Sequence, residues 1–190
     1  MTRKIEGDHI YLAPIRHEDS EIYARWLNEA ETSIFLALFP QIITPESSRD
    51  YFAQATAWGD HLFGITLRKN DTLIGSSGLL NIDFINRKAE IGLYIGAQDC
   101  LNQGYGSESV MLLLDYGFQV LNLNSIHLIP FSFNPRAIRC YEKCGFKIAG
   151  RLRETRIING KKYDQIYMDI LASEFPGYRL KEKIKSLLPE

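Results

Sequence analysis

LNQGYGSE, residues 101–108, is the stretch of this chain that decides the fold. Its two glycines allow unusual backbone dihedrals and let a ligand approach the main chain closely. The residues after it begin a strongly periodic helix, and the unpaired N–H groups and dipole of a helix start attract phosphate. The third glycine of a dinucleotide-binding loop and the Gly-Lys-Ser/Thr end of a Walker loop are both missing. The turn alone therefore indicates either a phosphate site or a structural turn.

The segments on either side of this turn favour a ligand site. Residues 89–96 read AEIGLYIG, a strand in which Gly92 and Gly96 share a face with Glu90 and Tyr94. A strand face kept clear by glycines is expected to admit a ligand. Residues 134–146 read NPRAIRCYEKCGF, where Asn134 caps a helix that Pro135 opens, and Tyr141 lies two turns later on nearly the same face.

The remaining chain alternates between strand and helix patterns without repeats, linkers or low-complexity segments. Strands are expected at 10–15, 61–67, 72–80, 89–95, 125–131, 146–152 and 165–170. Helices are expected at 17–30 with Asp19 or Ser20 as cap, at 44–58 with Thr44 as cap, after Gly106 and at 134–145, with 33–43 irregular and a basic amphipathic tail at 179–188. This order predicts one α/β domain, a mixed sheet flanked by helices, over residues 1–175, followed by an amphipathic tail at 176–190.

Composition excludes several classes of protein. Lys and Arg number 22 against 23 Asp and Glu, so nothing global favours nucleic acid or anionic lipid. No apolar run reaches the ~18–20 residues of a membrane span, and Met1–Gly7 lacks a signal core, which predicts a cytoplasmic protein. The three cysteines are expected to be reduced packing residues, and no Cys or His spacing suits a metal.

These motifs together resemble the GNAT acetyltransferase superfamily. The resemblance spans roughly Ile10–Leu171 and is most specific in the glycine turn with its helix and in the block from Asn134 to Phe146. Residues 115–118, DYGF, with 121–123, LNL, are similar to the subgroup of ribosomal-protein N-terminal and spermidine N-acetyltransferases.

The resemblance implies a V-shaped, splayed, mostly antiparallel mixed sheet, with acetyl-CoA as co-substrate in the cleft between strands 90–95 and 125–131. It implies direct attack of a primary amine on the thioester, with Tyr141 as the acid that protonates the leaving thiolate. Main-chain N–H groups of the glycine turn would bind the pyrophosphate, and the edge of the strand 93–95 the pantetheine arm. The implied cofactor-binding residues are Leu93, Tyr94, Ile95, Gln103, Gly104, Tyr105, Gly106, Ser107 and Asn134.

Two positions stay open. Glu90 is the first candidate for the base that deprotonates the amine, but an exposed or salt-bridged carboxylate explains it equally well. Leu101 stands where the family usually has Gln or Arg, so one side-chain contribution to cofactor binding is in doubt.

The acceptor also stays open. The loop at 34–40, IFLALFP, has Leu38 and Phe39 where the spermidine branch typically carries paired acids. A protein or peptide N-terminus, an amino sugar and a polyamine all remain candidate acceptors, the polyamine less favoured, and the loop could instead be core or a homodimer interface. The alternatives to an N-acetyltransferase are a catalytically silent CoA-binding or regulatory module and a transferase that uses a nucleotide or sugar phosphate.

Overall fold

The computed structural model describes residues 3–187 and is built on one eight-stranded mixed sheet. The spatial order is β1-β2-β3-β4-β5-β6-β8-β7, and every neighbouring pair is antiparallel except β5 with β6. The strands are β1 (Ile5–Glu6), β2 (Ile10–Pro14), β3 (His61–Leu67), β4 (Leu73–Asp83), β5 (Lys88–Ile95), β6 (Ser125–Leu128), β7 (Lys147–Ile158) and β8 (Lys161–Leu171).

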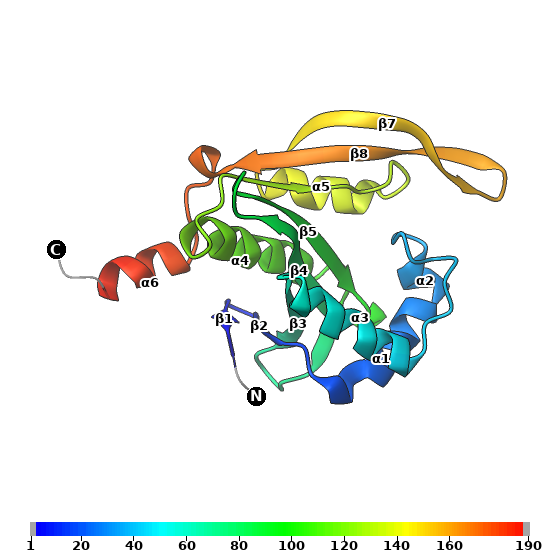
Figure 1. Ribbon diagram of the computed structural model, residues 1–190, viewed down its shortest axis with the longest axis horizontal. Coiled ribbons are helices and arrows are strands. Elements are labelled where there is room, and N and C mark those ends of the chain that lie inside the picture. Colours follow the sequence, from blue (N-terminus) through cyan, green and yellow to red (C-terminus); the bar gives the residue numbers. More distant parts are fainter. Residues whose placement is uncertain (1–2, 188–190) are drawn as a thin grey trace.

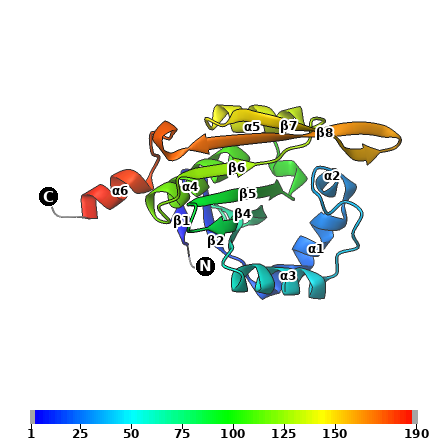
Figure 2. The same ribbon diagram turned by 45° about the horizontal axis from the view of Figure 1, so that its top comes forward.

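Helices cover both faces of this sheet (Figures 1 and 2). They are α1 (Ser20–Asn28), α2 (Ala30–Ser33), α3 (Pro45–Ala57), α4 (Tyr105–Gln119), α5 (Pro135–Lys143) and α6 (Leu180–Leu187), with single 3-10 turns at His17–Asp19, Gln98–Cys100 and Ala172–Glu174. The main core joins α4 to one sheet face, and a smaller aromatic cluster of Tyr23, Trp26 and Phe52 joins α1 and α3 to the other. Alternation along β5 follows from this division, because Ile91 and Leu93 pack in the main core and Tyr94 packs against the aromatic cluster.

The expected helix starts are mostly confirmed. Thr44 and Ser47 form a reciprocal capping box at α3, and the Asn134 side chain accepts a hydrogen bond from the Ala137 N–H at 3.1 Å to cap α5. Asp19 occupies the predicted N-cap position of α1, but its side chain makes no cap bond and instead pairs with Arg16 at 2.6 Å.

The sheet opens between β5 and β6. These strands pair only from Lys88 with Ser125 to Glu90 with His127, and β6 ends at Leu128 instead of the predicted Phe131. Phe131 makes an isolated bridge with Gln165 of β8 instead. In the described chain no strand pairs with β5 on this side beyond Glu90, so the main-chain edge of Leu93–Ile95 faces the opening.

Several elements depart from the expected bounds. The predicted strands at 146–152 and 165–170 are parts of a longer hairpin, β7–β8, that reaches beyond the body of the molecule (Figure 1). The short strand β1 and helix α2 were not predicted, and position 188 of the expected amphipathic tail lies outside the described residues. Helix α6 packs against α4, while the division of the chain at residue 175 stays a prediction.

Among residues 3–187, no helix is long and apolar enough to cross a membrane.

Candidate functional site

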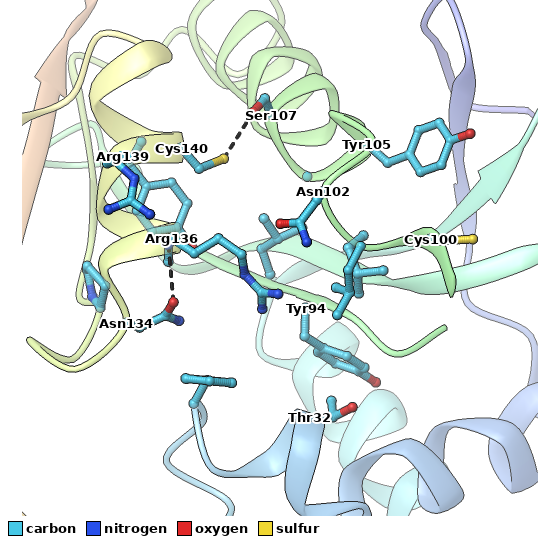
Figure 3. A pocket seen from close by; sticks show the side chains of 18 of the residues that line it. Thr32, Tyr94, Cys100, Asn102, Tyr105, Ser107, Asn134, Arg136, Arg139 and Cys140 are labelled. Carbon is cyan, nitrogen blue, oxygen red and sulfur yellow. Dashed lines mark hydrogen bonds between the residues drawn. The ribbon is translucent and has the colours of Figure 1, made fainter. Parts of the chain in front are cut away.

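A cavity of about 460 Å³ lies between β5, the start of α4, α5 and the segment around α2 (Figure 3). It brings together nine of the eleven residues predicted for the site, although these come from three separate parts of the sequence. They are Leu93, Tyr94, Ile95, Gly104, Tyr105, Gly106, Ser107, Asn134 and Tyr141. The two that do not line it are Glu90 and Gln103.

The start of α4 forms one wall. Gly104 precedes the helix in a left-handed conformation, with φ of 85°, and offers no side chain to cap the first turn. A Cβ atom at Gly106 would find its nearest neighbour, Leu93 Cδ2, at 3.8 Å, so this glycine leaves open space above the helix. Uncapped N–H groups beside open space make this turn a suitable place for an anion.

The Gln103 side chain supports this turn from outside. Its amide nitrogen donates to the Asp99 carbonyl oxygen at 2.6 Å and remains at the surface. Leu101, the departure from the family pattern, lines the cavity, as does Asn102 with φ of 59°.

Helix α5 forms the opposite wall. Asn134 caps this helix through its side-chain oxygen, which leaves the amide nitrogen outside the cap interaction. Tyr141 is half-buried and packs 6.1 Å from Phe146 between ring centroids. Burial raises the pKa of Tyr141, with smaller contributions from Cys140 and Cys144, so the phenol keeps its proton across the neutral range.

Glu90 lies apart from the cavity, in the part of the sheet where β5 still pairs with β6. Its carboxylate lies 3.8 Å from His127 Nε2 and accepts a hydrogen bond from Asn81 at 3.4 Å. These contacts agree with the structural interpretation of Glu90, and its action as a base stays a prediction.

The expectation that Gly92 and Gly96 keep a strand face clear for a ligand is wrong. A Cβ atom at Gly96 would overlap the Trp26 ring, and one at Gly92 would lie 2.8 Å from Leu80 Cδ1. Protein side chains therefore occupy the space beside both glycines, and the open side of β5 is its main-chain edge.

Sequence reasoning missed the charge of this cavity. Among the described residues that line it, Arg136, Arg139 and Lys143 carry positive charge and Glu31 carries negative charge. The three cations stand on α5, the wall opposite the start of α4, and their excess favours a ligand with several phosphates. The sequence did contain a signal for this charge, because Arg136, Arg139 and Lys143 are three and four positions apart and so lie near one face of a helix.

The loop at 34–40 contributes to the far end of the cavity through Phe35 and Leu36. Arg136 stands over the Phe35 ring at 5.7 Å, and Arg156 of β7 donates to the Leu36 carbonyl oxygen at 3.4 Å. The loop therefore lines the cavity in part and packs against the protein in part. Its aromatic residues contact guanidinium groups of α5 and β7.

Comparison with known proteins agrees with this geometry. A family model described as acetyltransferase (GNAT) domain matches residues 9–147. A spermidine N(1)-acetyltransferase of Vibrio cholerae is 39% identical over 103 residues, which cover 54% of this chain and only 59% of that enzyme. A Bacillus subtilis protein named "Putative ribosomal N-acetyltransferase YdaF" is 29% identical over 168 residues, 87% of each chain.

A solved structure shares the whole architecture. The spermidine N-acetyltransferase of Vibrio cholerae in complex with CoA and spermine superposes with a TM-score of 0.79 at 26% identity, covering 88% of this chain and 98% of that one. The splayed mixed sheet flanked by helices, expected from the sequence, is thereby confirmed.

Proposed function

Because the chain belongs to the GNAT acetyltransferase family, we propose that it transfers the acetyl group of acetyl-CoA to a primary amine by direct attack. Acetyl-CoA supplies the acetyl group as an activated thioester. The observation that carries the proposal is the single cavity that joins the uncapped start of α4, the open edge of β5 and Tyr141.

Each wall of the cavity has a role in this reaction. The first N–H groups of α4, with the cations of α5, hold the diphosphate. The main-chain edge at Leu93–Ile95 orients the pantetheine arm as an added strand would, and its N–H groups polarise the thioester carbonyl. The amide nitrogen of Asn134, which the helix cap does not use, donates a hydrogen bond to the CoA arm.

Proton transfers complete the step. The amine, freed of its extra proton by Glu90 or by water, forms the new C–N bond as the C–S bond breaks. Tyr141, protonated at neutral pH because its pKa is raised by burial, gives its proton to the leaving sulfur.

The acceptor is a peptide N-terminus or a small amine. The spermidine N-acetyltransferase of Vibrio cholerae, also solved with CoA and spermine, keeps polyamines among the candidates. The guanidinium group of Arg136 beside Phe35 disfavours a polycation, whereas the aromatic ring accommodates an amine with a single positive charge. We also propose that the protein forms a homodimer and is located in the cytoplasm.

The test has two stages. In the first, acetyl-CoA at about 100 times its Kd should stabilise the folded protein by roughly 2.7 kcal/mol, with ATP and NAD as controls. In the second, thiol release from acetyl-CoA is followed with a short peptide amide, glucosamine and spermidine. Stabilisation without any amine-dependent release would indicate a silent CoA-binding module, and absence of stabilisation would overturn the proposal.

A further inference from the structure

The cavity holds a cysteine for which the proposed reaction has no use. Cys140 lies on α5, lines the cavity and is partly accessible. Its Sγ atom lies 3.1 Å from Ser107 Oγ, across the gap between α5 and the first turn of α4 (Figure 3). One helical turn later, the buried Cys144 thiol lies 3.7 Å from the Ser107 carbonyl oxygen. Two thiols, one on α5 and one at its C-cap, therefore converge on the anion-attracting start of α4.

The charges around this sulfur stabilise a thiolate. Lys143 and Arg136 of α5 act on it, Arg139 lines the same cavity, and the positive end of the α4 dipole faces it through Ser107. The neighbouring thiol and phenol are those of Cys144, the C-cap of α5, and Tyr141. The hydrogen bond with Cys144 lowers the pKa of the Cys140 thiol, with further lowering from Ser107, Lys143 and Arg136, while burial opposes the shift.

A second cysteine in the same cavity provides an internal contrast. Cys100 also lines the cavity, but it is only 8% exposed. Burial and the neighbouring Asp99 raise the pKa of its thiol. Of the two lining cysteines, one is therefore prepared for nucleophilic attack and the other is protected from it.

We propose that Cys140 is a site of reversible S-thiolation by small disulfides that carry negative charge. The Cys140 thiolate attacks one sulfur of a disulfide R–S–S–R, a new Cys140–S bond forms, and the original S–S bond breaks. The leaving thiolate takes a proton from water, and the disulfide itself is the oxidant. The cations that stabilise the thiolate also attract the anionic reagent.

The adduct has a consequence that rests on the proposed function. It places an additional group in a cavity of about 460 Å³, against the same turn of α4 that is proposed to bind the diphosphate. Thiolation should therefore exclude acetyl-CoA until a reductant removes the group.

The test compares two disulfides of similar size and opposite charge, 3,3′-dithiodipropionate and cystamine. The fully reduced protein is treated at pH 7, and the rate at each cysteine is measured by peptide mass spectrometry, relative to the rate of N-acetylcysteine with the same reagent. Cys140 should react about tenfold faster than Cys100. Its relative preference for the dianion should exceed that of the free thiol by about tenfold, and Lys143→Gln should reduce this preference.

Matched variants identify the residue. Cys140→Ser should lose the rapid adduct and Cys100→Ser should keep it, while unfolding in urea should make all three cysteines react alike. Equal rates at Cys140 and Cys100 in the folded protein, or a dianion preference no greater than that of the free thiol, would overturn the inference.

A protection experiment separates this inference from the proposed function. Saturating acetyl-CoA, which has no free thiol, should slow the reaction at Cys140 at least tenfold. Selective reaction at Cys140 without such protection would support the modification site and contradict the proposed cofactor site.

Discussion

Tyr141 and Cys140 are neighbours on α5 with opposite acid–base character. Burial holds the proton on the Tyr141 phenol by raising its pKa, whereas the hydrogen bond with Cys144 favours loss of the proton from Cys140. Successive side chains on a helix point about 100° apart, so one turn can present a proton donor and a thiolate to different parts of one cavity. Single side chains therefore determine the chemistry proposed for this site, and two single-residue substitutions test it.

The first test removes one oxygen atom. Tyr141→Phe should lower kcat by ~10²–10⁴-fold with little change in acetyl-CoA affinity, because only the proton donor is lost. Since burial raises the pKa of Tyr141, the wild-type rate should not fall between pH 7 and about 10 through loss of this proton. Thiol-release rates measured over that range check both expectations, and an unchanged kcat in the variant would remove Tyr141 from the mechanism.

The second test fills the space over α4. Gly106→Val should raise the Kd for acetyl-CoA at least ~10-fold, or about 1.4 kcal/mol, by obstructing the phosphate turn. The melting temperature should hold, because the nearest atom to a Cβ there is 3.8 Å away. Gly150→Val on β7, with no atom within 4 Å, is the matched control for calorimetry. Equal affinity in the Gly106 variant would place the diphosphate elsewhere.

Single residues also mark the limit of sequence reasoning. The glycine turn, Asn134 and Tyr141 were predicted to share a site from their local patterns and the family resemblance, and all of them line the cavity. Gly96 could not be interpreted in this way, since its neighbour Trp26 is 70 positions away in the sequence. A glycine in a strand indicates a close approach, but only the fold identifies what approaches.

At the scale of elements, Asn134 caps α5 and is proposed to contact the cofactor as well. Asn134→Ala should lower the free energy of unfolding by about 1 kcal/mol, because the Ala137 N–H loses its cap. Asn134→Ser should keep most of that stability, since serine also caps helices. Both variants lose the amide nitrogen, so both should weaken acetyl-CoA binding several-fold in calorimetry. Full affinity in the serine variant would limit Asn134 to its cap.

Elements were predictable where local chemistry decides them. The Thr44–Pro45 pair was sufficient to predict the start of α3, and the apolar periodicity was sufficient to predict α4. Strand β6 ends three residues early because its partner β5 diverges after Glu90, and β7 extends to Ile158 because β8 pairs with it. Strand length is set by the neighbouring strand, which one sequence window does not contain.

At the scale of the whole molecule, Asp115 fixes the C-terminal segment to the body. Its fully buried carboxylate accepts hydrogen bonds from the main-chain N–H groups of Tyr178, at 3.2 Å, and Leu180. A contact between residues 63 and 65 positions apart could not be predicted from local pattern. The sequence showed Asp115 only as part of a family block.

Asp115→Ala should lower the free energy of unfolding by about 1–3 kcal/mol, because two N–H groups lose their acceptor. Asp115→Asn retains one acceptor oxygen and should lose less. Urea denaturation measures the loss, and limited proteolysis should show faster cleavage around residues 176–187 in the alanine variant. Wild-type stability and cleavage in that variant would mean that α6 docks without Asp115.

Because β5 is only partly paired, amide hydrogens in the middle of the sheet should exchange with solvent as fast as those of an edge strand. Leu93–Ile95 lies in an interior strand, yet within residues 3–187 no strand pairs with one side of its main chain. Its amide hydrogens on that side should swap with deuterium quickly in the empty protein and slowly once a pantetheine arm lies against them. Departure of a ligand bound there would break main-chain hydrogen bonds, so we expect the same strand edge to influence both its affinity and its residence time.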